Sequence, residues 1–87
     1  MRIIKPSRIH EYGRRYPDAD IPVREWLKVA KRSKWRNIGE VRHVYSSADA
    51  ARVASGGIVT VFNIGGNKYR LIVAIHYNVG FIFVLRF

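Results

Sequence analysis

The stretch that decides the fold is IVTVFNIGGNKYRLIVAIHYNVGFIFVLRF, residues 58–87. It contains three β-prone runs, and residues that favour turns separate them. The first separator, Gly65-Gly66-Asn67, contains residues that tolerate positive φ, and the second is Asn78-Val79-Gly80. The sequence therefore predicts three antiparallel strands joined as a meander, at Ile58–Ile64, Lys68–Tyr77 and Phe81–Phe87.

The middle strand has an apolar and a cationic face, because successive side chains of a strand point to opposite sides of the sheet. The apolar row suits packing under helices and consists of Tyr69, Leu71, Val73, Ile75 and Tyr77. The opposite row consists of Lys68, Arg70, Ile72, Ala74 and His76. We therefore expect the second row to face away from the helices.

The length of the second turn decides where Arg86 lies. A three-residue turn pairs Ile72 with Arg86, which brings Arg86 onto the face of Arg70, one diagonal step away. A two-residue turn moves Arg86 to the other face. The same counting through the first turn puts Phe62 opposite Arg70. With three residues in the second turn, the sequence predicts a cationic groove, flanked by aromatic rings and formed by Lys68, Arg70 and Arg86 with His76 beside them. Ordinary solvated charges on an open sheet face explain the same pattern equally well.

The N-terminal segment is predicted to form a short strand followed by a helix. Arg2–Ile4 can form the strand, since Pro6 starts a new element. Ser7 is the expected N-cap of a helix that runs to about Tyr16. The following Pro17-Asp18 ends that helix.

A second helix is the clearer one, because its apolar residues follow the i, i+3, i+4, i+7 pattern. Asp20 is its expected N-cap, and Pro22 lies in its first turn, where a missing N–H costs nothing. The apolar stripe consists of Val23, Trp26, Leu27 and Ala30. The remaining surface is cationic and contains Arg24, Lys28, Lys31 and Arg32.

A short third helix is predicted after a connector at 33–36. Asn37 and Glu40 have capping-box spacing, which favours a helix to about Tyr45. The small and polar residues 46–57 are interpreted mostly as loop. We therefore predict a single α+β domain over residues 1–87, in which two to three N-terminal helices pack on one face of a small, mainly antiparallel sheet.

Composition points to a polyanionic partner. Sixteen Lys and Arg against six Asp and Glu give a formal charge of +10 and a pI near 10.7. Such a field attracts RNA, DNA, an anionic membrane surface or an acidic protein. The chain has no cysteine, which excludes disulfides and Cys-ligated metals, and no apolar run of membrane-spanning length. We therefore expect a cytoplasmic protein that does not bind membranes.

The residues would suffice for metal-free chemistry on RNA. His10, His43 and His76 lie on separate predicted elements without a metal-ligand motif, so we expect neither a metal nor another cofactor. RNA carries its own nucleophile, the 2′-OH beside the scissile phosphate. A protein then needs only to orient that group, move protons and stabilise the growing negative charge, which Arg does well.

The stretch VFNIGGNKYRLIVAIHYN (61–78), followed by an apolar strand that ends in Arg86, resembles the signature of HigB toxins in the RelE superfamily. The resemblance implies the toxin of a type II toxin–antitoxin system, an endoribonuclease (mRNA interferase) that cleaves translated mRNA at the ribosome. It implies inhibition by a HigA-type antitoxin with a helix-turn-helix domain, and contact with operator DNA only through that antitoxin.

The family's functional residues fall on several positions of this chain. The strand Arg of the NKYRL motif falls on Arg70 and that of the next strand on Arg86, both expected to stabilise phosphate. Asn67 and Lys68 belong to the same motif and are expected to contact RNA. His76 is a candidate for proton transfer because of its place on the same strand face as Arg70, and not because of the resemblance. The cationic face of the second predicted helix, and not the resemblance, adds Arg24, Lys28 and Lys31 to the residues expected to contact RNA.

One departure from the family concerns the C-terminal end. Family members usually continue from the last strand into a T-H-x-E-Y-D segment that brings a His and a Tyr to the site, whereas this sequence stops at Phe87. We therefore expect the domain to be C-terminally truncated relative to the family, with an exposed strand edge at FIFVLRF that lost residues or a partner should cover. A catalytically inactive RNA-binding module is the alternative function. A DNA-binding protein is disfavoured, because no helix-turn-helix pattern is evident.

Overall fold

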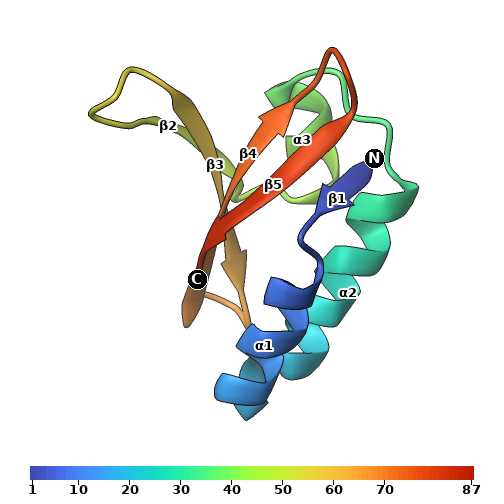
Figure 1. Ribbon diagram of the computed structural model, residues 1–87, viewed down its shortest axis with the longest axis vertical. Coiled ribbons are helices and arrows are strands. Elements are labelled where there is room, and N and C mark those ends of the chain that lie inside the picture. The colour runs from blue at the N-terminus through green and yellow to red at the C-terminus, as the bar shows by residue number, and fades with distance from the viewer.

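Three helices cover one face of a single five-stranded sheet, and the other face of the sheet has no helix (Figure 1). The structure is a computed structural model that describes residues 1–87. The predicted α+β class, with helices on one side of a mainly antiparallel sheet, is confirmed. In chain order the elements are β1 (Arg2–Ile4), α1 (Ser7–Arg15), the 3₁₀ turn η1 (Pro17–Ala19), α2 (Asp20–Arg32), α3 (Ile38–Val44), β2 (Asp49–Arg52), β3 (Ile58–Ile64), β4 (Tyr69–His76) and β5 (Phe81–Arg86).

The sheet has the strand order β1-β5-β4-β3-β2, in which only the pairing of β1 with β5 is parallel. The predicted meander of β3, β4 and β5 is confirmed, with boundaries within one residue of those expected. The interpretation of residues 46–57 as mostly loop is wrong for Asp49–Arg52, because this segment pairs with Ile58–Val61 of β3. The residues of this segment have little strand preference, and it forms a strand because its backbone is hydrogen-bonded to β3.

The predicted exposed edge at the last strand is also wrong. Strand β5 lies inside the sheet, between β1 and β4. Beyond the end of β1, the Arg8 guanidinium of α1 donates hydrogen bonds to the carbonyl oxygens of Val84 and Leu85, at 3.1 and 3.2 Å. The Phe87 ring stacks between Tyr12 and Tyr69, with ring centroids 4.9 and 5.2 Å apart. The end of β5 is therefore covered by the helical layer.

Two of the three predicted helix caps differ from the structure. Ser7 is the first residue of α1 and makes no capping hydrogen bond. Asp20 begins α2, and its carboxylate accepts a hydrogen bond from Arg24 at 2.9 Å instead of capping the helix. The Asn37 cap is confirmed, since its Oδ1 accepts from the Glu40 N–H at 3.0 Å. The preceding 3₁₀ turn carries the chain into α2 without a side-chain cap, which explains why Asp20 is free for Arg24.

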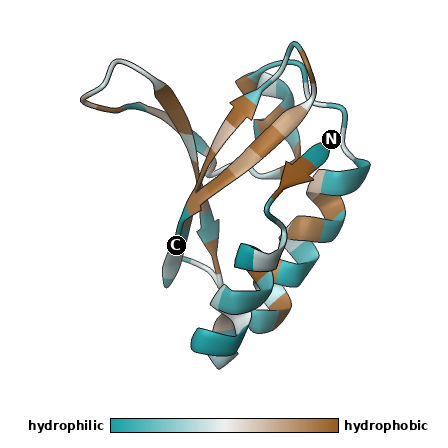
Figure 2. Cartoon of the chain, viewed as in Figure 1, coloured by the Kyte–Doolittle hydropathy of each residue, from teal (hydrophilic) through white to brown (hydrophobic).

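The core lies between the helices and the sheet, as the apolar stripe of α2 predicts. All four residues of that stripe are buried: Val23, Trp26, Leu27 and Ala30. They meet an aromatic group centred on Phe62, whose ring lies 5.3 Å from both Trp26 and Tyr45. Figure 2 shows hydrophobic residues concentrated on the strands and hydrophilic residues along much of α1. No helix has the length and hydropathy needed to cross a bilayer.

Candidate functional site

Arg70 and Arg86 lie on the sheet face that the helices leave open. Along β4, Leu71 and Val73 are buried against the helices, and the alternating residue Arg70 is exposed on the opposite face. Ile72 pairs with Arg86 of β5, so these two residues share a face. Arg70 is two residues before Ile72, which makes Arg70 and Arg86 diagonal neighbours. The predicted pairing of Ile72 with Arg86 is confirmed.

The register at Arg86 depends on a β-bulge that the sequence did not predict. The β4–β5 turn has four residues rather than three, because His76 pairs with Phe81. A regular ladder from that turn would bring Leu85 opposite Ile72 and direct Arg86 toward the helices. A shift in register between Ile72 and Val73 adds one residue to β5 and returns Arg86 to the open face.

Arg70 lines a hollow of about 300 Å³ on this face. Directly opposite Arg70 lies Asn63, not the predicted Phe62, which pairs with Leu71 in the core. The difference arises because four residues, 65–68, connect Ile64 to Tyr69. The Asn63 side chain donates a hydrogen bond to Asn67 Oδ1 at 3.2 Å. The other residues that line the hollow are Ser47, Asp49, Ala51 and Val61.

Sequence reasoning missed the polar residues around Arg70. Because side chains alternate along β3, Asn63 lies on the open face. A four-residue turn, used in the counting, would have predicted Asn63 opposite Arg70. Ser47 and Asp49 reach the hollow only because β2 pairs with β3. Neither the Arg70 nor the Arg86 guanidinium makes a hydrogen bond or ion pair within the protein, whereas those of Arg8, Arg24, Arg36 and Arg42 do. The two open-face guanidinium groups therefore keep their donors available.

Lys68 does not join the predicted groove with Arg70. It belongs to the β3–β4 turn, and its ammonium group pairs with the carboxylate of Asp18 in η1. The Tyr69 hydroxyl donates to the same carboxylate at 2.7 Å. These two hydrogen bonds lower the pKa of Asp18, and the contact raises the pKa of Lys68. Lys68 therefore anchors the turn to the helical layer, through a residue fifty positions away in the sequence.

This anchor predicts a pH dependence of stability. Folding lowers the Asp18 pKa, so its contribution is present above the unfolded value of about 4 and is lost as pH falls through the folded value. We expect the urea midpoint of the wild type to fall more between pH 5 and pH 2 than that of Asp18→Asn. Glu40, whose pKa is also lowered, titrates in both proteins and cancels in the comparison. Parallel midpoint curves would contradict the anchor.

His76 lies away from the Arg70–Arg86 pair. It is exposed at the last position of β4, and its ring contacts Phe83 edge to face at a centroid distance of 5.0 Å. Arg70 is six residues earlier on the same strand, roughly 20 Å away at ~3.3 Å per residue. The structure therefore brings together two of the three predicted catalytic residues and separates the third from them.

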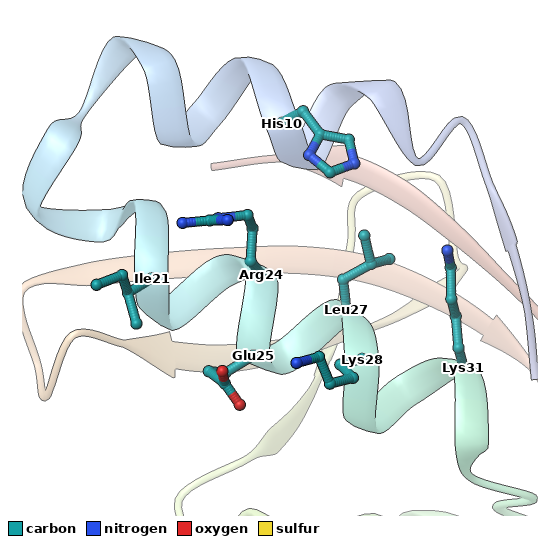
Figure 3. Close-up of a pocket in the computed structure, with 7 residues that line it drawn as sticks. All are labelled: His10, Ile21, Arg24, Glu25, Leu27, Lys28 and Lys31. Carbon is teal, nitrogen blue, oxygen red and sulfur yellow. The ribbon is translucent and has the colours of Figure 1, made fainter.

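The cations of α2 form a second surface on the outside of the helical layer. Arg24, Lys28 and Lys31 border a hollow of about 390 Å³ that His10 of α1 also lines (Figure 3). Arg24 is paired with Asp20 at 2.9 Å. Because the buried side of α2 faces the sheet, these cations and the open sheet face cannot contact one short RNA segment together. The predicted RNA contacts thus divide into two separate surfaces.

Comparison with known proteins identifies the family of this chain. A search of curated proteins finds no match to the chain. The sequence profile of the HigB toxin family, described as the RelE-like toxic component of a toxin–antitoxin system, matches residues 19–87. This range includes α2, α3 and strands β2–β5, and thus both open-face arginines. Since the match covers most of the chain, the protein belongs to the HigB toxin family and is the toxin of a toxin–antitoxin system, with an antitoxin as its partner.

Proposed function

We propose that this toxin is an mRNA interferase, an endoribonuclease that cleaves translated mRNA at the ribosome without a metal ion. A HigA-type antitoxin with a helix-turn-helix domain would inhibit it and would provide its only contact with operator DNA. The observation that carries the proposal is that Arg70 and Arg86, whose guanidinium groups have no partner within the protein, are diagonal neighbours on an open sheet face. The +10 charge of the chain supports a polyanionic substrate.

Cleavage of RNA by its own 2′-OH requires groups that stabilise the phosphate, which such a pair provides, and groups that transfer protons. The ribose 2′-OH attacks the adjacent phosphorus, and the 5′-oxygen of the next nucleotide leaves. Negative charge on the nonbridging phosphate oxygens grows during this step, and guanidinium groups stabilise it with forked hydrogen bonds. DNA lacks the 2′-OH and would not be cleaved. Arg70 and Arg86 are the groups that would bind this phosphate, with Asn63 and Asn67 beside them to position the ribose.

Proton transfer near Arg70 needs a group within reach of the same phosphate. His76 is too distant for that step. Among the residues that line the Arg70 hollow, Asp49 has the only carboxylate. We therefore assign proton transfer to Asp49, and we expect Asp49→Asn to slow cleavage without weakening RNA binding.

The separation of His76 from Arg70 also favours a second candidate function, a non-catalytic RNA-binding module on the same fold. Two measurements distinguish the functions: growth arrest on induced expression, and single-turnover cleavage of ribosome-bound mRNA by the purified protein. Growth arrest with cleavage supports the interferase. RNA that is bound but left intact supports the binding module.

RNA binding is expected to depend steeply on salt, because phosphate contacts release counterions. For single strands, each neutralised phosphate contributes about 0.7 to the slope of log K against log salt. Because the two arginines are proposed to bind one phosphate, we expect the Arg70→Ala/Arg86→Ala double variant to reduce the slope by about 0.7. The slope is measured by fluorescence anisotropy with a labelled single-stranded RNA, at salt concentrations from roughly 50 to 300 mM.

The matched control is Lys28→Ala/Lys31→Ala, which removes the same charge from the outer side of α2. We expect it to leave the slope unchanged if only the sheet face binds RNA. An equal reduction by both double variants would mean that the α2 surface also contacts phosphates. A flat slope for the wild type would contradict an RNA substrate altogether.

A further inference from the structure

We propose that the open sheet face carries a second RNA subsite, at the end opposite Arg70, where nucleobases stack on Phe81 and Phe83. The inference rests on the proposed RNA substrate and identifies where its bases bind. The two rings belong to β5, whose other end carries Arg86. The residues that contact the phosphate and those that contact the bases would thus lie at opposite ends of β5.

The register of the sheet brings several side chains to this end of the open face. Phe81 lies between Arg2 of β1 and His76 of β4, and these three residues are directly paired. Phe83 is paired in the same way between Ile4 and Ala74. The intervening Ile82 is buried against the helices, so Phe81 and Phe83 must project from the opposite face. The helices lie on the other side of the sheet and leave both rings half-buried.

The rings form a continuous row with a cation at one end. The His76 ring contacts Phe83 at 5.0 Å, and Phe83 contacts Phe81 at 6.4 Å, both with an interplanar angle of 73°. The Arg2 guanidinium lies 5.9 Å from the centre of the Phe81 ring. A row of rings with a nearby guanidinium is the combination that binds single-stranded nucleic acid without sequence preference, because every base has a π-face.

Charge on this surface favours a polyanion such as RNA. Strands β1, β4 and β5 contain no acidic residue, and they carry Arg2, Arg70 and Arg86 along with His76. The two ends of the face are connected through Ile72 and Ala74 of β4, with no helix or loop between them. An RNA strand that places its phosphate at Arg70 and Arg86 can therefore extend along β4 and β5 to the rings.

The first test needs no variant of the protein. Wild-type affinity is measured for a set of single-stranded dodecamer RNAs, each with one abasic ribose at a different position. Abasic sites keep the phosphate charge and remove only the base. We expect one or two positions at which the missing base weakens binding by roughly 5- to 150-fold, the range reported by alanine substitution of stacking aromatics. Uniform affinity across the set would overturn the subsite.

The second test assigns the stacked bases to these rings. Phe81→Leu/Phe83→Leu keeps apolar volume and removes the aromatic surface, and its fold is checked by its urea midpoint. We expect its affinity for the intact RNA to fall to that of the wild type for the abasic RNA, with no further loss on abasic substitution and an unchanged salt slope. Phe81→Tyr/Phe83→Tyr should retain the affinity. Val79→Ala, which shortens an exposed apolar side chain in the adjoining turn, is the matched control and should have no effect.

The outcomes separate this subsite from the proposed function. If the wild type binds no RNA, both fail. If binding responds to Arg70→Ala/Arg86→Ala but not to the leucine variant, the subsite is wrong and the RNA substrate stands. If the leucine variant binds RNA normally and no longer binds the antitoxin, the aromatic row is a protein-binding surface and the proposal is overturned.

Discussion

Arg70→Ala is expected to slow single-turnover RNA cleavage by about 10²- to 10³-fold, the effect of removing one donor that stabilises transition-state charge. On induced expression, the variant should no longer arrest growth. Arg70 is exposed and makes no ion pair within the protein, so the substitution opens no cavity and leaves no buried charge unpaired. We therefore expect the urea midpoint of the variant to match that of the wild type.

Two further variants identify the cause of such a loss. Arg70→Lys keeps the charge but loses the planar fork of donors, and it should recover only part of the cleavage rate. Arg52→Ala removes the same charge from the exposed edge strand β2 and should cleave as the wild type does. Full activity of Arg70→Ala would refute the phosphate-binding role. Equal losses in Arg70→Ala and Arg52→Ala would point to net charge rather than to the open face.

Local patterns were sufficient to predict most of the strands and helices. The alternation along β4 and the turn residues around it predicted β3, β4 and β5 within one residue. The 3.6-residue spacing of apolar residues in α2 predicted its buried side. In both cases the signal and the structure depend on the same short-range periodicity.

Long-range pairing explains what local patterns missed. Strand β2 has the residues Asp-Ala-Ala-Arg, which do not favour strands, and it forms because β3 offers hydrogen bonds. Lys68 leaves the open face because the carboxylate of Asp18, far away in the sequence, accepts a hydrogen bond from its ammonium group. The Ile72–Arg86 pairing was predicted from a three-residue turn, whereas a four-residue turn and a bulge produce it. The sequence thus predicted the two arginines of the candidate site and missed the polar residues around them.

Phe62→Ala is expected to have the largest effect on stability, a loss of about 3–5 kcal/mol. The Phe62 side chain is completely buried and contacts the rings of Trp26, Trp35 and Tyr45, at centroid distances of 5.3, 6.2 and 5.3 Å. These rings come from α2, from the following connector and from the end of α3, so Phe62 joins the helical segments to β3. Its truncation leaves a cavity between elements that cannot readily close around it.

Such a loss is a large share of the total stability of a small domain, which is typically about 5–15 kcal/mol. Ile58→Ala on the same strand is the control, because Ile58 is 62% exposed and its truncation should change stability by less than about 0.5 kcal/mol. Urea unfolding, monitored by circular dichroism, gives both values. If the m-value is unchanged, a difference in midpoint reports a difference in the free energy of unfolding. Since Phe62 faces away from Arg70, any Phe62→Ala protein that remains folded should retain its affinity for RNA. A small stability loss for Phe62→Ala would mean that the helices are held to the sheet mainly by other contacts, such as the Arg8 and Asp18 hydrogen bonds to β5 and the β3–β4 turn.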